Sequence, residues 1–163
     1  MLIFTQEAQM NKIIIRRLKL ADYSGVRQVD ELTQYQYLGE KWKKFSLREK
    51  EKHLVSRRKE FGINVKTGYS LVATMDGKTI GFLFAYKTLP FHGALYIHHL
   101  AIEPNFQGKG VGALLYKELI RLAKPTKIKR IVALINLDNP KSMRLHEKLG
   151  FKLQDRKEAI LEI

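Results

Sequence analysis

The sequence contains no cysteine. This absence excludes disulfide bonds, a thiol nucleophile and a zinc site with cysteine ligands, and it is typical of proteins in reducing compartments. No stretch approaches the ~20 consecutive apolar residues that a membrane-spanning helix needs. The first residues also lack the basic start, long apolar core and small-residue cleavage site of a secretory signal. We therefore expect a cytoplasmic protein with no membrane association.

Acidic residues are scarce, with 16 Asp and Glu against 30 Lys and Arg and a formal net charge of +14. Such an excess creates a positive field that attracts anions, so nucleic acid, an acidic protein surface and a phosphorylated small molecule are all candidate partners. The densest basic stretch covers residues 41–60. It is typical of a solvated helix face with Glu/Lys pairs, and a docking surface for an anionic partner is the alternative.

The length of 163 residues and the hydrophobic fraction of 45% are those of one globular domain with a real core. We interpret residues 1–11 as a short leader, with Met10 as a second candidate start, and residues 12–163 as the domain. The sequence shows no internal repeat, linker or low-complexity segment.

Hydrophobic patterning predicts strands and helices in a mixed order. Asp76-Gly77 between two strand-like runs signals a tight hairpin, Ser46 and Glu49 are spaced as a capping box, and Gly150 is placed to end a helix. These signals predict an α/β fold with a mixed sheet. The expected strands are 12–20, 69–75, 78–87, 94–102, 130–136 and 151–163, and the expected helices are 21–35, 46–61, 111–124 and 140–150.

A glycine-rich loop, "QGKGVG", precedes the expected helix 111–124. A helix N-terminus presents free N–H groups and positive dipole, glycines let a ligand approach the backbone, and Lys109 adds a charge, so the loop suits a pyrophosphate. The phosphate-loop pattern G-x-x-x-x-G-K-S/T is absent. A dinucleotide-binding fingerprint on Gly108, Gly110 and Ala113 is a rival interpretation. Against it, the first glycine comes several residues after the preceding strand instead of in a tight turn, and few residues of the chain follow the loop. A purely structural turn is the third reading.

Two motifs resemble those of the GNAT superfamily of N-acyltransferases. "IEPNFQGKGVG" is similar to its acetyl-CoA-binding pattern Q/R-x-x-G-x-G/A, and "NPKSMRLHEKLGF" is similar to a segment that follows about thirty residues later. The resemblance spans about residues 12–163. It implies a single-domain mixed sheet with an antiparallel N-terminal meander, a parallel splayed pair around the glycine loop and helices on both faces. The matching positions are Gln107, Gly110, Gly112, Asn139, Ser142, Gly150 and Phe151.

The resemblance also implies chemistry. Acetyl-CoA would be the acyl donor, no metal would take part, and a primary amine would attack the thioester directly. The pantetheine arm would insert beside the strand 94–102, and the pyrophosphate would lie on the loop. The residues implied to contact the coenzyme are Leu100, Ala101, Ile102, Gln107, Gly108, Lys109, Gly110, Val111, Gly112, Asn139, Ser142 and His146.

Four residues are candidates for catalysis. The Leu100 N–H is implied as the donor to the tetrahedral oxyanion. His146 stands where the family usually has a tyrosine that protonates the leaving thiolate, and a packing histidine is the equal alternative. His98 or His99 is a candidate base for the amine, and a histidine of the core or surface without a catalytic role is the alternative. In a regular strand these two point to opposite faces, which argues against one shared metal ion, although a bulge would change which one faces the cleft.

The acceptor, a small molecule or a protein, is not specified by any residue. Tyr35, Tyr37 and Trp42 are placed either to line its site or to pack, and the positive charge disfavours strongly cationic acceptors. Two other functions stay open: a catalytically weak acyl-CoA-binding sensor, because the usual tyrosine is missing, and a nucleic-acid-associated module, because of the charge. A homodimer also stays open.

Overall fold

A computed structural model describes residues 12–90, 92–157 and 159–162 of the chain, so the expected leader lies outside the described residues. Its centre is a five-stranded sheet in the order β1-β2-β3-β4-β5. The first three pairings are antiparallel and the β4–β5 pairing is parallel, which confirms the predicted mixed sheet. The strands are β1 (Ile13–Arg17), β2 (Leu71–Met75), β3 (Lys78–Lys87), β4 (Ala94–Ile102) and β5 (Arg130–Ala133).

The hairpin between β2 and β3 is the predicted two-residue turn. Asp76 has φ +49° and Gly77 has φ +77°. Positive φ at both central residues matches the right-handed twist of the flanking strands, so the turn fixes the register in which Met75 faces Lys78.

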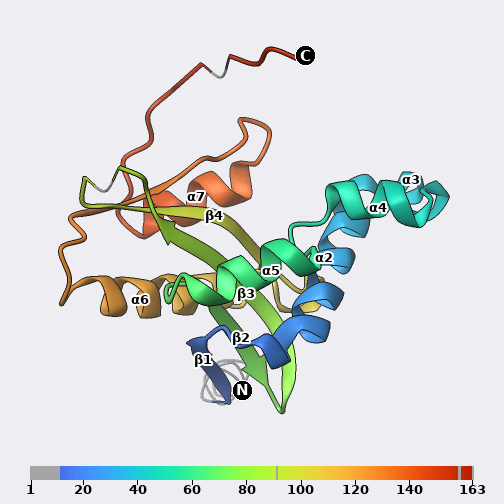
Figure 1. Cartoon of the computed structure of the whole chain (residues 1–163), viewed down its shortest axis with the longest axis horizontal. Helices are drawn as coiled ribbons and strands as arrows, with labels where there is room; N and C mark the ends of the chain where they lie inside the picture. The colour runs from blue at the N-terminus through green and yellow to red at the C-terminus, as the bar shows by residue number, and fades with distance from the viewer. Residues whose placement is uncertain (1–11, 91, 158, 163) are drawn as a thin grey trace, which may run out of the picture.

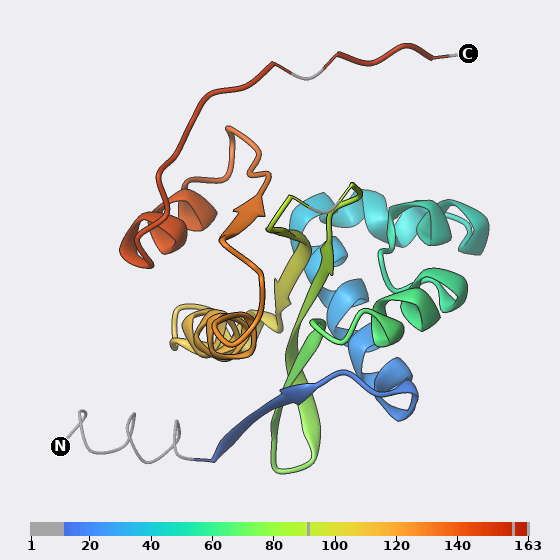
Figure 2. The same cartoon turned by 60° about the vertical axis from the view of Figure 1, so that its left-hand side comes forward.

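Helices cover both faces of the sheet, as predicted (Figure 1). Figure 2 shows the helices of the first half of the chain on one side, and α6 (Val111–Ala123) and α7 (Pro140–Lys148) on the other. The α6 face of the core is built around Leu83, Leu95, Val111, Leu115, Tyr116 and Leu119. The opposite face is built around Val26, Val29, Phe61, Val72, Phe82 and Phe84, where α2 (Tyr23–Leu38) and α5 (Arg58–Lys66) pack.

The predicted helix 46–61 is two helices, α4 (Leu47–His53) and α5, so that prediction is wrong in its continuity. The expected capping box is present, since Ser46 accepts from the Glu49 N–H while the Glu49 side chain accepts from Ser46. The break follows from Ser56, whose N–H bonds to the Asp30 carboxylate at 2.8 Å instead of a helix carbonyl. The expected helix 21–35 also extends further than predicted, because α2 ends at Leu38 and α3 (Glu40–Lys44) follows after Gly39.

The last predicted strand is also wrong. Residues 151–157 and 159–162 form no regular element, and Figure 2 shows them running away from the sheet. Strand-like alternation alone does not make a strand, because each backbone N–H and C=O needs a neighbouring strand to bond to. Among the described residues, β5 pairs with β4 and no further strand lies beyond it.

None of the helices in the described part of the chain is both long and apolar enough to cross a membrane.

Candidate functional site

The parallel pair β4–β5 separates after four residues. Its register runs from Ala94 opposite Arg130 to Ile97 opposite Ala133, where β5 ends. β4 continues to Ile102, so its second half has β3 on one side and no paired strand on the other within the described residues. This is the splayed pair that the resemblance implies, and it leaves strand backbone available to an extended ligand.

The glycine loop follows this half of β4 after a short connection. A short 3-10 turn, η2 (Pro104–Phe106), separates β4 from Gln107, and Gly110 is the N-cap of α6. Gly108 has φ +73° and Gly110 has φ +84°, so both hold the left-handed conformation that glycine adopts without steric cost. A Cβ added at Gly108 would meet no atom within 4 Å, so space in front of the loop is open.

Gly112 serves another purpose. A Cβ there would lie 3.2 Å from the Leu145 Cδ2 and 3.8 Å from the Leu100 Cδ2. The small residue therefore lets α6 approach α7 and β4 closely. Of the three glycines, two shape the loop and one packs the helix behind it.

Lys109 also belongs to this loop and is exposed. Its Nζ lies 5.5 Å from the centre of the Phe106 ring. The ring face attracts the ammonium, which keeps a positive charge beside the free N–H groups at the start of α6.

Helix α7 is held at both ends. The Asn139 Oδ1 accepts from the Ser142 N–H at 3.1 Å and caps the first turn. At the other end, the Gly150 N–H bonds to the Glu147 carbonyl and the Phe151 N–H bonds to the His146 carbonyl, with Gly150 at φ +86°. This paired pattern is the Schellman ending and confirms the predicted role of Gly150.

His146 points into the interface between α7 and α6 and is only 3% exposed. Its Nδ1 lies 2.7 Å from the Ser142 carbonyl oxygen. A carbonyl only accepts, so Nδ1 carries the proton and Nε2 accepts from the Tyr116 hydroxyl, its close partner. Phe151 packs against both rings, at 5.0 Å from His146 and 5.5 Å from Tyr116. Both nitrogens of His146 are therefore engaged inside the protein.

Tyr116 is fully buried, and burial raises the pKa of its hydroxyl well above the usual range. Nothing in the sequence distinguishes it from the neighbouring core residues Leu115 and Leu119, so sequence reasoning missed it as the partner of His146.

The two strand histidines lie at a β-bulge. Phe84 faces His99 and Ala85 faces Ile97, which leaves His98 as the extra residue. The His99 ring stacks on Phe82 at 5.7 Å and the His98 ring lies 6.4 Å from Tyr86. Phe82 and Tyr86 are four positions apart on β3 and share a face, so the bulge brings both histidines to the α2 side. The expectation for a regular strand therefore does not apply here.

The two histidines differ in environment. His98 is exposed and His99 is half-buried. Burial, with a smaller contribution from the charge of His98, lowers the pKa of His99 to about 4. His99 is therefore neutral at physiological pH.

The aromatic residues of α2 and α3 divide between packing and exposure. Trp42 is 7% exposed and lies against Phe45 and His53, which stack on each other at 5.1 Å. Tyr37 is 72% exposed and Tyr35 is 38% exposed. Trp42 thus belongs to a small aromatic core of the α3–α4 hairpin, whereas the two tyrosines are accessible to a ligand.

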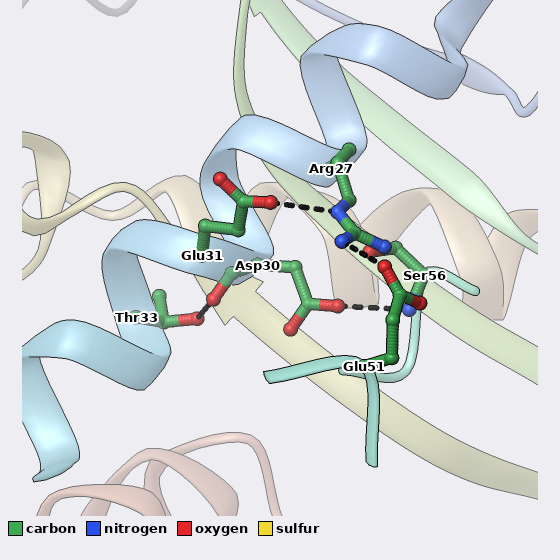
Figure 3. A network of polar contacts seen from close by, with 6 residues as sticks. All are labelled: Arg27, Asp30, Glu31, Thr33, Glu51 and Ser56. Atoms are coloured by element: carbon green, nitrogen blue, oxygen red, sulfur yellow. Dashed lines mark hydrogen bonds and ion pairs between the residues drawn. The ribbon is translucent and has the colours of Figure 1, made fainter. Parts of the chain in front are cut away.

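A polar network fastens α2 to this hairpin (Figure 3). Arg27 bonds to Glu31 at 2.7 Å and closely to Glu51 of α4. Asp30 is completely buried, and its Oδ2 accepts the Ser56 N–H. Its Oδ1 and the Ser56 hydroxyl are both buried without a hydrogen-bond partner in the described structure. Burial raises the pKa of Asp30.

Two hollows of the described surface lie away from the glycine loop. One of about 700 Å³ is bounded by β1 and the C-terminal half of α6, and another of about 410 Å³ lies between the end of α6 and β5. The glycine loop is at the opposite end of α6. No group of three or more His, Asp or Glu side chains able to hold a metal ion occurs in the part of the chain that the structure describes.

The sequence model of the acetyltransferase (GNAT) family matches residues 30–151, well over half of the chain. Together with the splayed pair and the glycine loop, this match shows that the chain belongs to the GNAT family.

Proteins similar to this chain in sequence or in fold include several acetyltransferases. An L-methionine sulfoximine/L-methionine sulfone acetyltransferase of Pseudomonas aeruginosa is 29% identical over 104 residues, covering 61% of this chain and 60% of that protein. An L-2,4-diaminobutyric acid acetyltransferase of Nocardia farcinica is 27% identical over 78 residues, 48% of this chain and 40% of that protein. This chain matches 60% or less of the length of these relatives. The PaiA N-acetyltransferase of Thermoplasma acidophilum, in complex with coenzyme A, shares the fold with a TM-score of 0.75 at 19% identity, over 89% and 92% of the two chains.

The buried Asp30 leads to a pH-dependent prediction for Asp30→Asn. Because burial raises the pKa of Asp30, the folded protein favours the protonated carboxyl. The stability that this proton contributes is complete below about pH 4 and is lost as pH rises through the pKa of Asp30 in the folded protein. An amide keeps an acceptor for the Ser56 N–H and carries no charge. We expect D30N to be more stable than wild type at pH 8 by about 1 kcal/mol, and the difference to shrink toward pH 4, measured by urea unfolding.

The exposed Asp138 provides the control, because the D138N substitution removes a charge that is not buried in the protein. A D30N protein less stable than wild type at pH 8 would show that the favourable contacts of the carboxylate outweigh the cost of burying its charge, and would contradict the expectation.

Proposed function

We propose that this protein is an acetyl-CoA-dependent N-acetyltransferase. The observation that carries the proposal is the left-handed glycine loop, Gly108 to Gly110, which precedes α6 and follows, after a short turn, the half of β4 that does not pair with β5. Free N–H groups and helix dipole suit a pyrophosphate, and an open strand edge suits the two amides of pantetheine. The residues of the loop and of the open strand edge thus fit coenzyme A, and the proposed reaction uses no metal ion.

In this proposal the backbone of Leu100, Ala101 and Ile102 bonds to the pantetheine arm. The loop from Gln107 to Gly112, with Lys109 and Val111 inside it, holds the pyrophosphate. Asn139 and Ser142 contact the far side of the coenzyme; both lie in the first turn of α7, where the Asn139 side chain also caps the helix.

The reaction is the attack of a neutral primary amine on the thioester carbonyl. The new C–N bond forms, and the carbonyl oxygen becomes an oxyanion that the Leu100 N–H stabilises. The C–S bond then breaks to release the coenzyme thiolate, and the proton that the new amide nitrogen loses goes to the thiolate, so that the products are the amide and the free thiol. An alkylammonium has a pKa of about 10, so a base must remove its proton before attack.

The decisive experiment follows thiol release from acetyl-CoA over a panel of amines. The panel includes L-methionine sulfoximine and L-2,4-diaminobutyric acid, the amino acids in the names of the relatives, and peptides with free N-termini and lysines. Acetyl-CoA at 100 times its dissociation constant should also stabilise the protein by about 2.7 kcal/mol, seen as a higher melting temperature.

The two outcomes separate the candidate functions. Stabilisation without thiol release would favour an acyl-CoA sensor. No stabilisation, with salt-sensitive retention on heparin, would contradict the proposal and favour an anion-binding module built on the exposed lysines of α3 and α4.

For the base, we favour His98 over His99. His98 is exposed at the bulge, whereas a pKa of about 4 makes His99 a weak acceptor of protons at neutral pH. We expect H98Q to lower kcat about 100-fold or more and H99Q to change it less, measured by thiol release at pH 7.5. The reverse order would assign the base to His99 instead.

The acid is tested at His146. To protonate the thiolate, this ring must first give up the hydrogen bond that its Nε2 accepts from Tyr116 and take up at Nε2 a proton released by the amine. If it does so, H146F lowers kcat more than it weakens acetyl-CoA binding, while Y116F, which frees Nε2, keeps kcat. If His146 only packs, both variants lose about 1–3 kcal/mol of stability and keep kcat alike. Thiol-release kinetics and urea unfolding of the two variants measure the difference.

A further inference from the structure

A reciprocal amide pair joins helix α2 to the glycine loop. The Gln107 Nε2 donates to the Gln36 Oε1 at 2.7 Å, and the Gln36 Nε2 donates back to the Gln107 Oε1 at 3.2 Å. The same Gln107 Nε2 also donates to the Ile102 carbonyl at 3.0 Å. The two glutamines are 71 residues apart in the chain, and the pair closes a contact between the two halves of the domain.

The Ile102 carbonyl sets the orientation of the whole pair. A carbonyl only accepts, so the Gln107 amide must turn its NH₂ group toward Ile102. Both Nε2 protons are then used, one by Ile102 and one by Gln36, while Oε1 accepts from Gln36. The Gln107 side chain is thus committed to the protein and does not reach outward to a phosphate.

We propose that Gln36 is a positioning residue for the coenzyme loop, an inference that rests on the proposed function. By holding the Gln107 side chain from the α2 side, Gln36 fixes the residue that immediately precedes Gly108. The free N–H groups of Gly108, Lys109 and Gly110 then keep the geometry that a pyrophosphate needs before any ligand arrives. Preorganisation of this kind raises affinity by lowering the ordering cost of binding.

The anchor is suited to this role because α2 is itself held firmly. Val26 and Val29 lie in the core, and Arg27 and Asp30 tie the helix to α4 and to the chain before α5. Gln36 extends from this fixed helix, so the loop takes its position from the face of the sheet opposite to α6. No sequence signal indicates the pair, because glutamine on an exposed helix surface is ordinary.

The test uses Gln36→Met, which keeps the length of the side chain and removes both hydrogen bonds. Gln34→Met is the matched control, because Gln34 is on the same helix and its side chain makes no hydrogen bond in the described structure. We expect Q36M to weaken coenzyme A binding by about threefold to tenfold and to raise the KM for acetyl-CoA with kcat unchanged. Q34M should match wild type in both.

A double-mutant cycle asks whether Gln36 acts through Gln107. In a Q107A background, Q36M should have no further effect on coenzyme A binding, because its partner is already gone. An equal loss in both backgrounds, or no loss in either, would overturn the proposal.

Backbone amide hydrogen exchange in the ligand-free protein separates this inference from the proposed function. Q36M should speed exchange at Gly108, Lys109 and Gly110 and leave the urea midpoint unchanged, while Q34M changes neither. If wild type binds no coenzyme A, the proposed function fails and the exchange result alone decides whether Gln36 orders the loop. Unchanged exchange would overturn the positioning role.

Discussion

The candidate site depends on the separation of the parallel strands β4 and β5. Four residue pairs hold the two strands in parallel register, and after Ile97 and Ala133 they separate. Every element of the candidate site is arranged around this point: the bulge at His98 follows it, the glycine loop begins where β4 ends, and α7 is the helix that follows β5. A strand that lacks one neighbour would normally be a liability. Here the open edge is what receives an extended ligand in the proposed function.

The contact between α6 and α7 sets the rear wall of the site. His146, Tyr116 and Phe151 form one buried group in which each nitrogen of the imidazole has a partner. Gly112 allows the two helices to approach, and Gly150 ends α7 so that Phe151 turns back onto it. The resemblance in sequence puts His146 where the family usually has a tyrosine, and in this structure the side chain has its own internal hydrogen bonds. In the proposed function, a role as acid would compete with these bonds.

Local sequence signals predicted the structure correctly where a residue type favours one particular local geometry, such as a tight turn or a helix end. Asp76-Gly77, the capping box at Ser46 and the ending at Gly150 all have the predicted geometry, and the two motifs indicated the family and the sheet. Predictions failed where the outcome depends on distant partners. The break before α5 follows from the Asp30 carboxylate, 26 residues away, and the described residues of the predicted last strand pair with no strand of the sheet. The sequence did not indicate a role for Gln36 or Tyr116 for the same reason. Their hydrogen-bond partners, Gln107 and His146, lie 71 and 30 positions later in the chain.

The α3–α4 hairpin carries its own small core, with Trp42 enclosed by Phe45 and His53. The Arg27–Glu51 contact joins this hairpin to α2, and the Asp30–Ser56 contact holds the chain that follows it. Its packing is therefore largely separate from that of the sheet. The aromatic contacts of the hairpin involve neither the glycine loop nor the β4–β5 pair among the described residues. In the proposed function, the side of the site that receives the coenzyme is therefore built without the packing of this hairpin.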